Sequence, residues 1–111
     1  MIDYRELIIE LSRKKCFMDE YGNKTRRKEH NSAMSKLNDL AVDLNNPEGE
    51  KILHELLDHE DERVIMSAAM LSFKLDFNRI KAIQKTVYVR DNSKDSIISF
   101  GAEMMLEQWK K

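Results

Sequence analysis

Apolar residues recur every three to four positions along most of the chain, a spacing that places them on one face of a helix. The pattern predicts six helices, over about residues 3–18, 25–44, 47–57, 62–75, 79–90 and 94–109. Their buried faces are expected to hold, in chain order, Tyr4, Leu7, Ile8, Leu11 and Met18; Ala33, Leu37, Leu40 and Leu44; Ile52, Leu53, Leu56 and Leu57; Val64, Ala68, Leu71 and Leu75; Ile80, Ile83 and Val87; and Ile98, Ala102, Met105 and Trp109.

Short polar breaks separate these segments. Asn46 is the expected N-cap of the third helix, because its side chain can accept from a free backbone N–H while Pro47 tolerates the first helical position. Asp61 is expected to cap the fourth helix, and Ser93 the last one. Residues 21–23 and 76–78 also interrupt the apolar pattern. Such short connections favour antiparallel packing of neighbouring helices.

Residues 86–89 allow two interpretations. They are β-branched or aromatic throughout, which is typical of a strand. Their position inside an otherwise helical pattern favours the fifth helix, and a local strand is the alternative.

A weak internal repeat relates the fourth and sixth helices. Aligning Ala69 with Ala102 pairs three further positions 33 residues apart: Val64 with Ile97, Ala68 with Gly101 and Leu71 with Met104. Paired small residues in a helix allow a second helix to approach closely, and repetition at this period is typical of stacked helical hairpins. The sequence therefore predicts one all-α domain over residues 1–111, built as a stack of about three antiparallel hairpins. A compact bundle of the same six helices is the alternative.

Composition agrees with a helical domain. Apolar residues make up 41% and charged residues 35% of the 111 residues, and 3 Gly and 1 Pro are too few for a many-turned β fold. The formal net charge of −1 supplies no global field toward nucleic acid or an anionic membrane. The chain opens without the basic and apolar regions of a signal peptide and has no apolar run long enough to span a membrane. We expect a cytoplasmic protein.

The residues that most often carry chemistry form no recognisable motif. Cys16 is the single cysteine, so an intrachain disulfide and a cysteine-rich metal site are excluded. His54 and His59 lie five positions apart, which does not place them on one helix face, so they are expected to be a surface and a turn residue and not metal ligands. His30 is the only candidate to activate Cys16 as a nucleophile, and a structural thiol is favoured. We expect no cofactor, no metal and no enzymatic activity.

Charge is segregated along the chain although it balances overall. Seven basic residues stand against two acidic ones between positions 13 and 28, and seven acidic residues stand against Lys51 between positions 48 and 62. Opposed patches can steer a charged partner. The alternative is that both are ordinary solvated faces, with several carboxylates acting as helix caps.

Two stretches resemble known proteins. Residues 56–69, with a leucine pair, a short polar turn, a valine and an alanine pair, resemble the pattern of HEAT-like repeats. Residues 100–109 resemble the C-terminus of a small bacterial family that carries a HEAT-like domain of unknown function. Proteins of this type are similar to many found beside bacterial toxin genes, where they act as immunity proteins. The resemblance implies a HEAT-like stack and a role in protein binding.

These observations together predict a non-enzymatic module that binds proteins, in the form of an immunity-type inhibitor that occludes a cationic bacterial toxin. The expected contacts are Glu55, Asp58, Glu60, Glu62 and Met66. Met66 is included as an exposed ridge, although methionines of this helix also suit core packing. Two alternatives stay open. One is a nucleic-acid-binding module that uses the basic segment Lys24–Lys28, and the other is a structural or self-assembling repeat that depends on Trp109.

Overall fold

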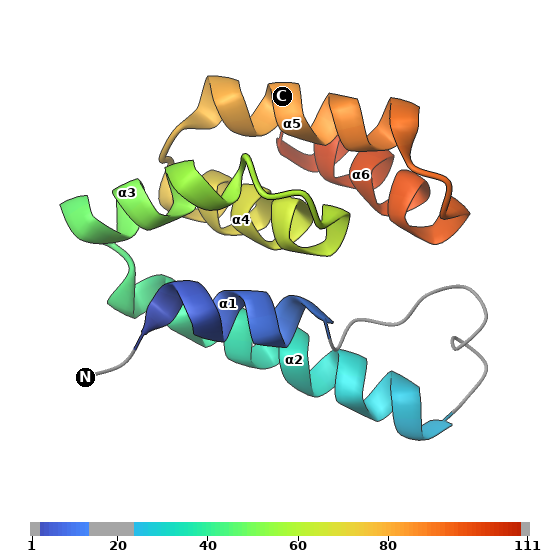
Figure 1. Cartoon of the computed structure of the whole chain (residues 1–111), viewed down its shortest axis with the longest axis horizontal. Coiled ribbons are helices and arrows are strands. Elements are labelled where there is room, and N and C mark those ends of the chain that lie inside the picture. Colours follow the sequence, from blue (N-terminus) through green and yellow to red (C-terminus); the bar gives the residue numbers. More distant parts are fainter. Residues whose placement is uncertain (1–2, 14–23, 110–111) are drawn as a thin grey trace.

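A computed structural model describes residues 3–13 and 24–109, with the backbone alone for residues 24–31. These ranges hold six α-helices and no strand (Figure 1). In chain order the helices are α1 (Tyr4–Arg13), α2 (Lys24–Asp43), α3 (Pro47–Leu56), α4 (Glu62–Leu75), α5 (Arg79–Asn92) and α6 (Ser96–Trp109). The predicted all-α class is confirmed, and residues 86–89 are helical. Residues 14–18 of the first predicted helix and the break at 21–23 lie outside the described residues.

The six helices form three consecutive hairpins. Helices α1 and α2, α3 and α4, and α5 and α6 pack on each other, and the second helices of successive hairpins also meet, α2 on α4 and α4 on α6. This is the stacked arrangement that the sequence predicts, with each hairpin covering an apolar face of its neighbour.

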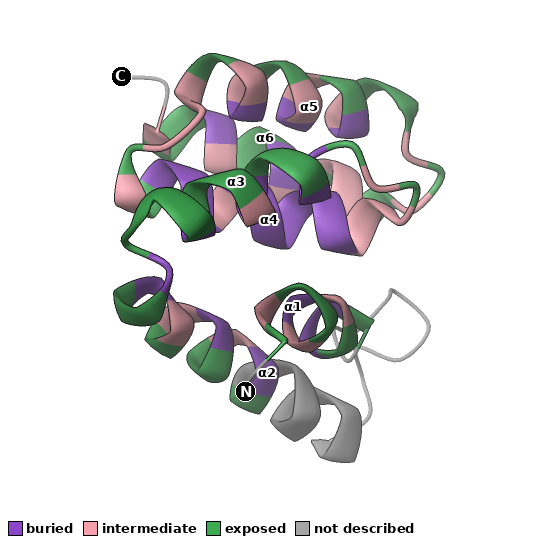
Figure 2. Cartoon of the chain, turned by 60° about the vertical axis from the view of Figure 1, so that its left-hand side comes forward, coloured by how far each residue is buried: buried purple, intermediate pink, exposed green. Residues whose placement is uncertain are grey.

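Helix α4 is the centre of the molecule. It lies against all five other helices, and nine of its 14 residues are buried (Figure 2). The predicted stripe from Val64 to Leu75 is therefore one part of a helix that is covered on nearly every side. The small residues Ala68 and Ala69 are both fully buried, which lets neighbouring helices approach α4 closely.

Two of the predicted helix caps are confirmed. The Asn46 side chain accepts a hydrogen bond of 2.8 Å from the backbone N–H of Gly49, and Pro47 is the first residue of α3. The Asp61 carboxylate accepts one of 2.9 Å from the backbone N–H of Arg63 at the start of α4. Both caps satisfy N–H groups that the first helical turn leaves free.

The predicted cap of the last helix is wrong. Helix α6 begins at Ser96, and the Asp95 carboxylate, not Ser93, accepts from the backbone N–H groups of Ile97 and Ile98, at 2.9 and 3.3 Å. The Ser93 hydroxyl instead accepts from the N–H of Asp95. Sequence preference alone does not separate a serine from an aspartate two residues later, since both are strong caps.

The position of this cap also corrects the repeat. Helices α4 and α6 begin 34 residues apart, at Glu62 and Ser96, and their caps Asp61 and Asp95 share this offset. The predicted offset of 33 would pair fully buried Leu71 with Met104, which is 47% exposed. With an offset of 34, Leu71 corresponds to the partly buried Met105, and Ala68 to the fully buried Ala102.

The predicted buried face of α5 is wrong for Ile80, which is 76% exposed. The residues that α5 buries are Ala82, Thr86 and Val89. Burial of Thr86 leaves no hydrogen-bonding group unsatisfied on its side chain, because its hydroxyl donates to the carbonyl of Ala82 at 2.7 Å. The spacing of large apolar residues does not predict this buried face, because small and hydroxyl-bearing residues form much of it.

The C-terminal residue of α6 closes the stack. The Trp109 ring lies parallel to that of Phe73 in α4, with centroids 6.1 Å apart and an interplanar angle of 11°. The Arg79 guanidinium donates to the Trp109 carbonyl. Trp109 therefore has a partner inside the molecule, as expected of a residue that covers the end of a core.

Candidate functional site

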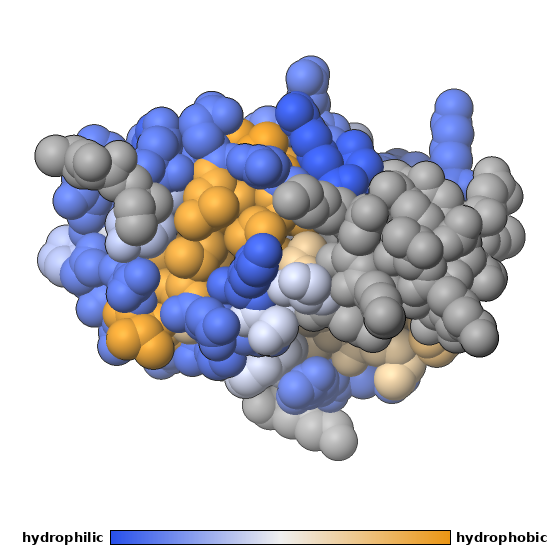
Figure 3. Space-filling model, turned by 90° about the horizontal axis from the view of Figure 1, so that it is seen from below, coloured by the Kyte–Doolittle hydropathy of each residue, from blue (hydrophilic) through white to orange (hydrophobic). Residues whose placement is uncertain are grey.

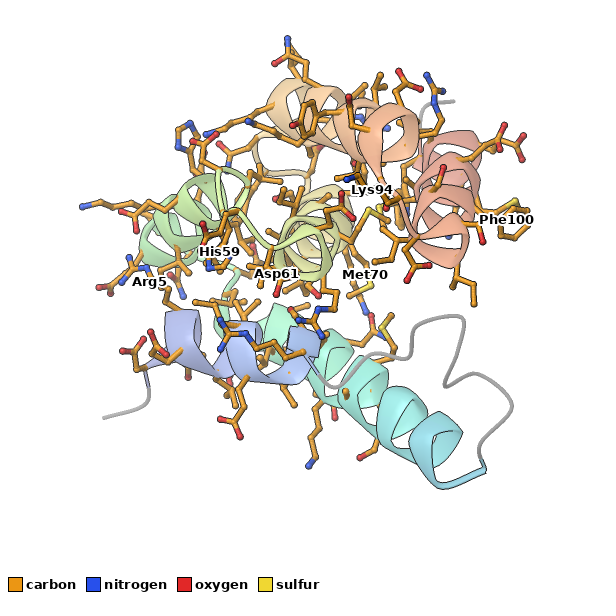
Figure 4. All side chains as sticks on the ribbon, turned by 45° about the vertical axis from the view of Figure 1, so that its right-hand side comes forward. Arg5, His59, Asp61, Met70, Lys94 and Phe100 are labelled. Carbon is orange, nitrogen blue, oxygen red and sulfur yellow. The ribbon has the colours of Figure 1, made fainter. Side chains whose placement is uncertain are left out.

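The predicted acidic contacts gather around the connection between α3 and α4. Glu55 is near the end of α3, Asp58 and Glu60 lie in the connection, and Glu62 is the first residue of α4. We call Glu55, Asp58, Glu60 and Glu62 the acidic turn. Figure 4 shows the neighbouring residues His59 and Asp61 along the boundary with α1. The four carboxylates are thus close together along the chain, but Glu55 and Asp58 reach different helices, α1 and α5.

Glu55 is already paired within the chain. Its carboxylate forms an ion pair with the guanidinium of Arg5 in α1, 50 positions away in the sequence. The two side chains are 45% and 44% exposed. An ion pair this open to water contributes at most about 1 kcal/mol to the free energy of unfolding, so Arg5 is a weak competitor for any partner of Glu55.

Asp58 is held by two lysines of α5. Its carboxylate lies 2.5 Å from the Lys81 ammonium and 3.0 Å from that of Lys85. The hydrogen bond from Lys81 and then that from Lys85 hold the pKa of Asp58 below its usual value. Lys81 also donates to the carbonyl of His54 at 3.0 Å. The connection is therefore tied to α5 by a surface network.

The remaining two carboxylates differ in exposure. Glu62 is half-buried and accepts a hydrogen bond of 2.7 Å from the Ser93 hydroxyl, which links α4 to the connection before α6. Glu60 is exposed, and no described residue pairs with it. Glu60 is therefore the member of the acidic turn whose charge is most available to another molecule.

Met66 does not form an exposed ridge. Its side chain is 7% exposed and belongs to a small core cluster with Ile65, Val89 and Ala102. The expected contact is wrong because α5 and α6 cover this side of α4, which a single-helix pattern does not reveal. Core packing, the other interpretation of this methionine, is the one the structure supports.

Asp61 combines its capping role with ion pairs. Its carboxylate lies 2.9 Å from the Arg63 guanidinium and 3.9 Å from that of Arg13 at the end of α1. Partial burial raises the pKa of Asp61, but the hydrogen bonds from the side chain and backbone of Arg63 outweigh this effect, so the pKa lies below its usual value. The ionised carboxylate is thus the form that stabilises the fold.

Asp61→Asn is expected to keep the α4 cap. The free energy of unfolding of this variant should decrease less in acid than that of the wild type. Because the folded-state pKa of Asp61 lies below the unfolded value near 3.8, its ionised form stabilises the protein above that pH, and this contribution disappears as the pH falls through the folded-state value. Urea unfolding at about pH 7 and about pH 3 should show a smaller decrease for Asp61→Asn than for the wild type. Asp61→Ala should lose about 1 kcal/mol more than Asp61→Asn at neutral pH, since asparagine caps a helix and alanine does not. Equal pH dependence in wild type and Asp61→Asn would contradict the assigned role of the charge.

The two histidines lie as surface and turn residues. His54 is exposed on α3, and His59 is half-buried in the turn, where its Nδ1 accepts from the Asp61 N–H at 3.0 Å. In the described part of the chain, no three His, Cys, Asp or Glu residues are placed to hold a metal ion. No described helix combines the length and apolar character needed to cross a membrane.

The structure describes the basic segment by its backbone alone and does not describe the single cysteine. Residues 24–28 form the first turns of α2, and their side chains lie outside the described residues, as does Cys16. The nucleic-acid alternative therefore stays a prediction.

One cleft was not predicted. It has a volume of about 470 Å³ and lies where the start of α1, the end of α2 and the start of α3 meet. The Tyr4 hydroxyl donates to the Asp43 carboxylate at 3.4 Å beside it, and desolvation together with the charge of Asp43 raises the pKa of Tyr4. The other residues that line the cleft are mostly exposed and include both acidic and basic side chains. No sequence signal marks it, because three separate segments build it.

The surface formed by α1 and α2 exposes apolar side chains between polar ones (Figure 3). Ile9 and Leu40 on these helices are partly buried against the core, whereas Val42 is 82% exposed. Leu40 and Val42 are two positions apart and so point to different faces of α2. A single exposed valine is ordinary for a protein surface.

Comparison of the chain with known proteins found no matching family model, no matching curated protein and no matching solved structure.

Proposed function

We propose that this protein is a non-enzymatic protein-binding module, and more specifically a cytoplasmic immunity-type inhibitor that occludes a cationic toxin domain. The observation that carries the proposal is the exposure of three carboxylates close together in the chain, Glu55, Asp58 and Glu60, at the end of α3 and in the short connection that follows it. The resemblance of residues 56–69 to HEAT-like repeats, together with the analogy between small proteins of this type and immunity proteins, supports the choice of partner.

Two of these carboxylates have intramolecular cations, which shapes how a partner would bind. The ion pair of Glu55 with Arg5 is open to water on both sides, and such a pair contributes little to the stability of the fold. Asp58 is 56% exposed, but it is held by both Lys81 and Lys85, and the Lys81 side chain is only 21% exposed. Lysine or arginine side chains of a partner can replace Arg5 at small cost. Glu60 offers its charge directly. Because Arg5, Lys81 and Lys85 pair with these carboxylates, the surface favours recognition by a matched pattern of charges over long-range attraction.

The contact set is therefore smaller than the predicted one. Glu62 is half-buried and bound by Ser93, and Met66 is buried. Neither side chain is available without rearrangement. The proposal rests on Glu55, Asp58 and Glu60.

Glu60→Lys is expected to weaken the complex with the toxin partner by about tenfold, because one attractive contact becomes a repulsive one. The partner is first identified by co-expressing the protein with the product of each neighbouring gene and isolating a one-to-one complex with a product that is toxic alone. The affinity of wild type and Glu60→Lys is then measured by calorimetry. Glu60 is the suitable position because no described residue pairs with it, so the fold loses no ion pair that the structure describes.

Asp39→Lys is the matched control. Asp39 is exposed on α2, so the substitution makes the same change in net charge on another element and should leave the affinity unchanged. Equal weakening by both variants would indicate a general charge effect and contradict the proposed site. Isolation of nucleic acid that salt releases, with no neighbouring protein bound, would contradict the proposed function and favour the basic segment.

A further inference from the structure

Helix α6 carries the one cluster of exposed large apolar residues in the described part of the chain. Five such side chains are exposed, Val42, Ile80, Tyr88, Phe100 and Met104. Only Phe100, at 61%, and Met104, at 47%, lie one helical turn apart. The other three are isolated from one another along α2 and α5, which is ordinary for a soluble surface.

The cluster faces away from the core. Helix α6 buries Ala102 and Leu106, and the spacing of Phe100 and Met104 places both on the opposite side of the helix. Figure 4 shows the Phe100 ring pointing outward from α6 and away from the other helices. Ile97, one turn before Phe100, is half-exposed. A Cβ added to the adjacent residue Gly101 would meet no atom of the residues beyond its chain neighbours within 4 Å, so the helix surface at this glycine is open.

Carboxylates border this apolar surface. Glu103 and Glu107 are exposed, and positions i+3 and i+7 from Phe100 lie on the same side of the helix. Helix α6 contains no lysine or arginine. Arg90 of α5 interacts with Glu103 but is hydrogen-bonded to Asp91 at 2.9 Å. No described residue pairs with Glu107. We call Ile97, Phe100, Glu103, Met104 and Glu107 the outer face of α6.

We propose that the outer face of α6 binds an amphipathic helix of a partner protein that carries apolar and basic residues on the same side. This second surface rests on the proposed protein-binding function. An exposed aromatic ring is a common anchor of protein interfaces, and a methionine adapts to the residues it meets. The open space beside Gly101 accommodates a side chain of the bound helix, as in the packing of ridges into grooves. Basic residues of that helix would meet Glu103 and Glu107.

The charges within α6 also disfavour a second copy of this chain as the occupant. Two outer faces packed together would bring Glu103 and Glu107 of both copies into one interface, with no cation from either α6. Like charges at an interface oppose association. A basic partner removes this repulsion and turns both carboxylates into attractive contacts.

The test uses two synthetic helical peptides as probes, one of leucine and lysine and one of leucine and glutamate, with leucine at the same i, i+3, i+4, i+7 positions. Fluorescence anisotropy of the labelled peptides against the full chain should show binding of the lysine peptide at least about tenfold tighter than that of the glutamate peptide. Phe100→Ser should weaken binding of the lysine peptide by about tenfold, and Glu107→Lys should weaken it several-fold.

Tyr88→Ser and Asp39→Lys are the matched controls. Tyr88 is an aromatic residue of similar exposure, 57%, on α5, and both control variants should bind the lysine peptide as the wild type does. Circular dichroism shows whether each variant is folded, and both Phe100 and Glu107 are exposed, so their replacement is compatible with folding.

Three results would overturn the proposal. These are an unchanged affinity in folded Phe100→Ser, equal binding of the two peptides, and a dimer in sedimentation that Phe100→Ser abolishes, which would assign the face to a second copy. The lysine peptide is a cation that the acidic turn can also attract, so Glu60→Lys is a further control and should bind this peptide as the wild type does. With that control, failure of the assay counts against the outer face of α6 alone. Failure of Glu60→Lys to weaken the toxin complex counts against the acidic turn alone.

Discussion

Gly49→Ala is expected to lower the free energy of unfolding by about 3 kcal/mol, because the added methyl group has no room. A Cβ at this position would lie 2.0 Å from the carbonyl oxygen of Leu44 and 2.6 Å from its carbonyl carbon. Both are main-chain atoms of the residue that directly follows α2, so relief of the clash requires α3 to move away from this connection. That movement would also disturb the Asn46 cap, which holds the Gly49 N–H at 2.8 Å.

Gly101→Ala is the matched control and is expected to have the opposite sign. Gly101 lies inside α6, where an added Cβ meets nothing within 4 Å. Replacing a helical glycine with alanine at an open position stabilises a protein by about 0.5–1 kcal/mol, because the unfolded chain loses conformational freedom. Both variants replace one hydrogen with a methyl group. Comparing their free energies of unfolding therefore separates the steric effect at Gly49 from the effect of glycine on backbone entropy.

Urea unfolding followed by circular dichroism measures both variants. A lower midpoint with an unchanged slope for Gly49→Ala, and a higher midpoint for Gly101→Ala, are the expected results. If Gly49→Ala unfolds at the wild-type midpoint, the close approach of α3 to Leu44 is not a feature of the protein in solution.

Leu71→Ala is expected to cost about 2–5 kcal/mol, since it leaves a cavity in the centre of the stack. Leu71 is fully buried on α4, the helix that all the others contact. Hairpins on both sides of α4 share this core, so the cavity cannot close by the movement of a single helix. A loss of this size removes a large part of the stability of a small domain.

Met104→Ala tests the corrected register of the repeat. The offset of 33 residues would make Met104 the counterpart of Leu71, whereas the offset of 34 assigns that place to Met105. Because Met104 is 47% exposed, its replacement should change the free energy of unfolding by no more than about 0.5 kcal/mol. Comparable losses in Leu71→Ala and Met104→Ala would contradict the outward position of Met104.

The carboxylates of the acidic turn show that a charged segment in sequence need not become a charged face. Glu55, Asp58 and Glu62 each reach a residue of another element, through Arg5, Lys81 and Ser93. These contacts connect the α3–α4 hairpin to α1 and to the α5–α6 hairpin. A functional role for the same residues then requires partner groups that compete with contacts already present, and this is why Glu60 gives the sharpest test.

Local sequence determined the helices and most of their ends. Asn46 followed by Pro47 starts α3, and Asp61 starts α4, because a cap depends on hydrogen bonds that span only two or three residues. The apolar spacing of α2 likewise predicts the buried residues Ala33, Leu37 and Leu44. Each of these features arises within one or two helical turns, so neighbouring residues contain the information needed to predict it.

Tertiary structure decided which faces are covered and which charges are free. Ile80 is exposed while Thr86 is buried, because the position of α5 on α4 selects the small face and not the most apolar one. Met66 is hidden by helices that follow it in the chain, and Phe100 is left in the open because no described helix packs on that side of α6. Glu55 finds its cation 50 positions away. Contacts between residues so distant in the chain exist only once the hairpins have stacked, and no periodicity along a single helix contains them.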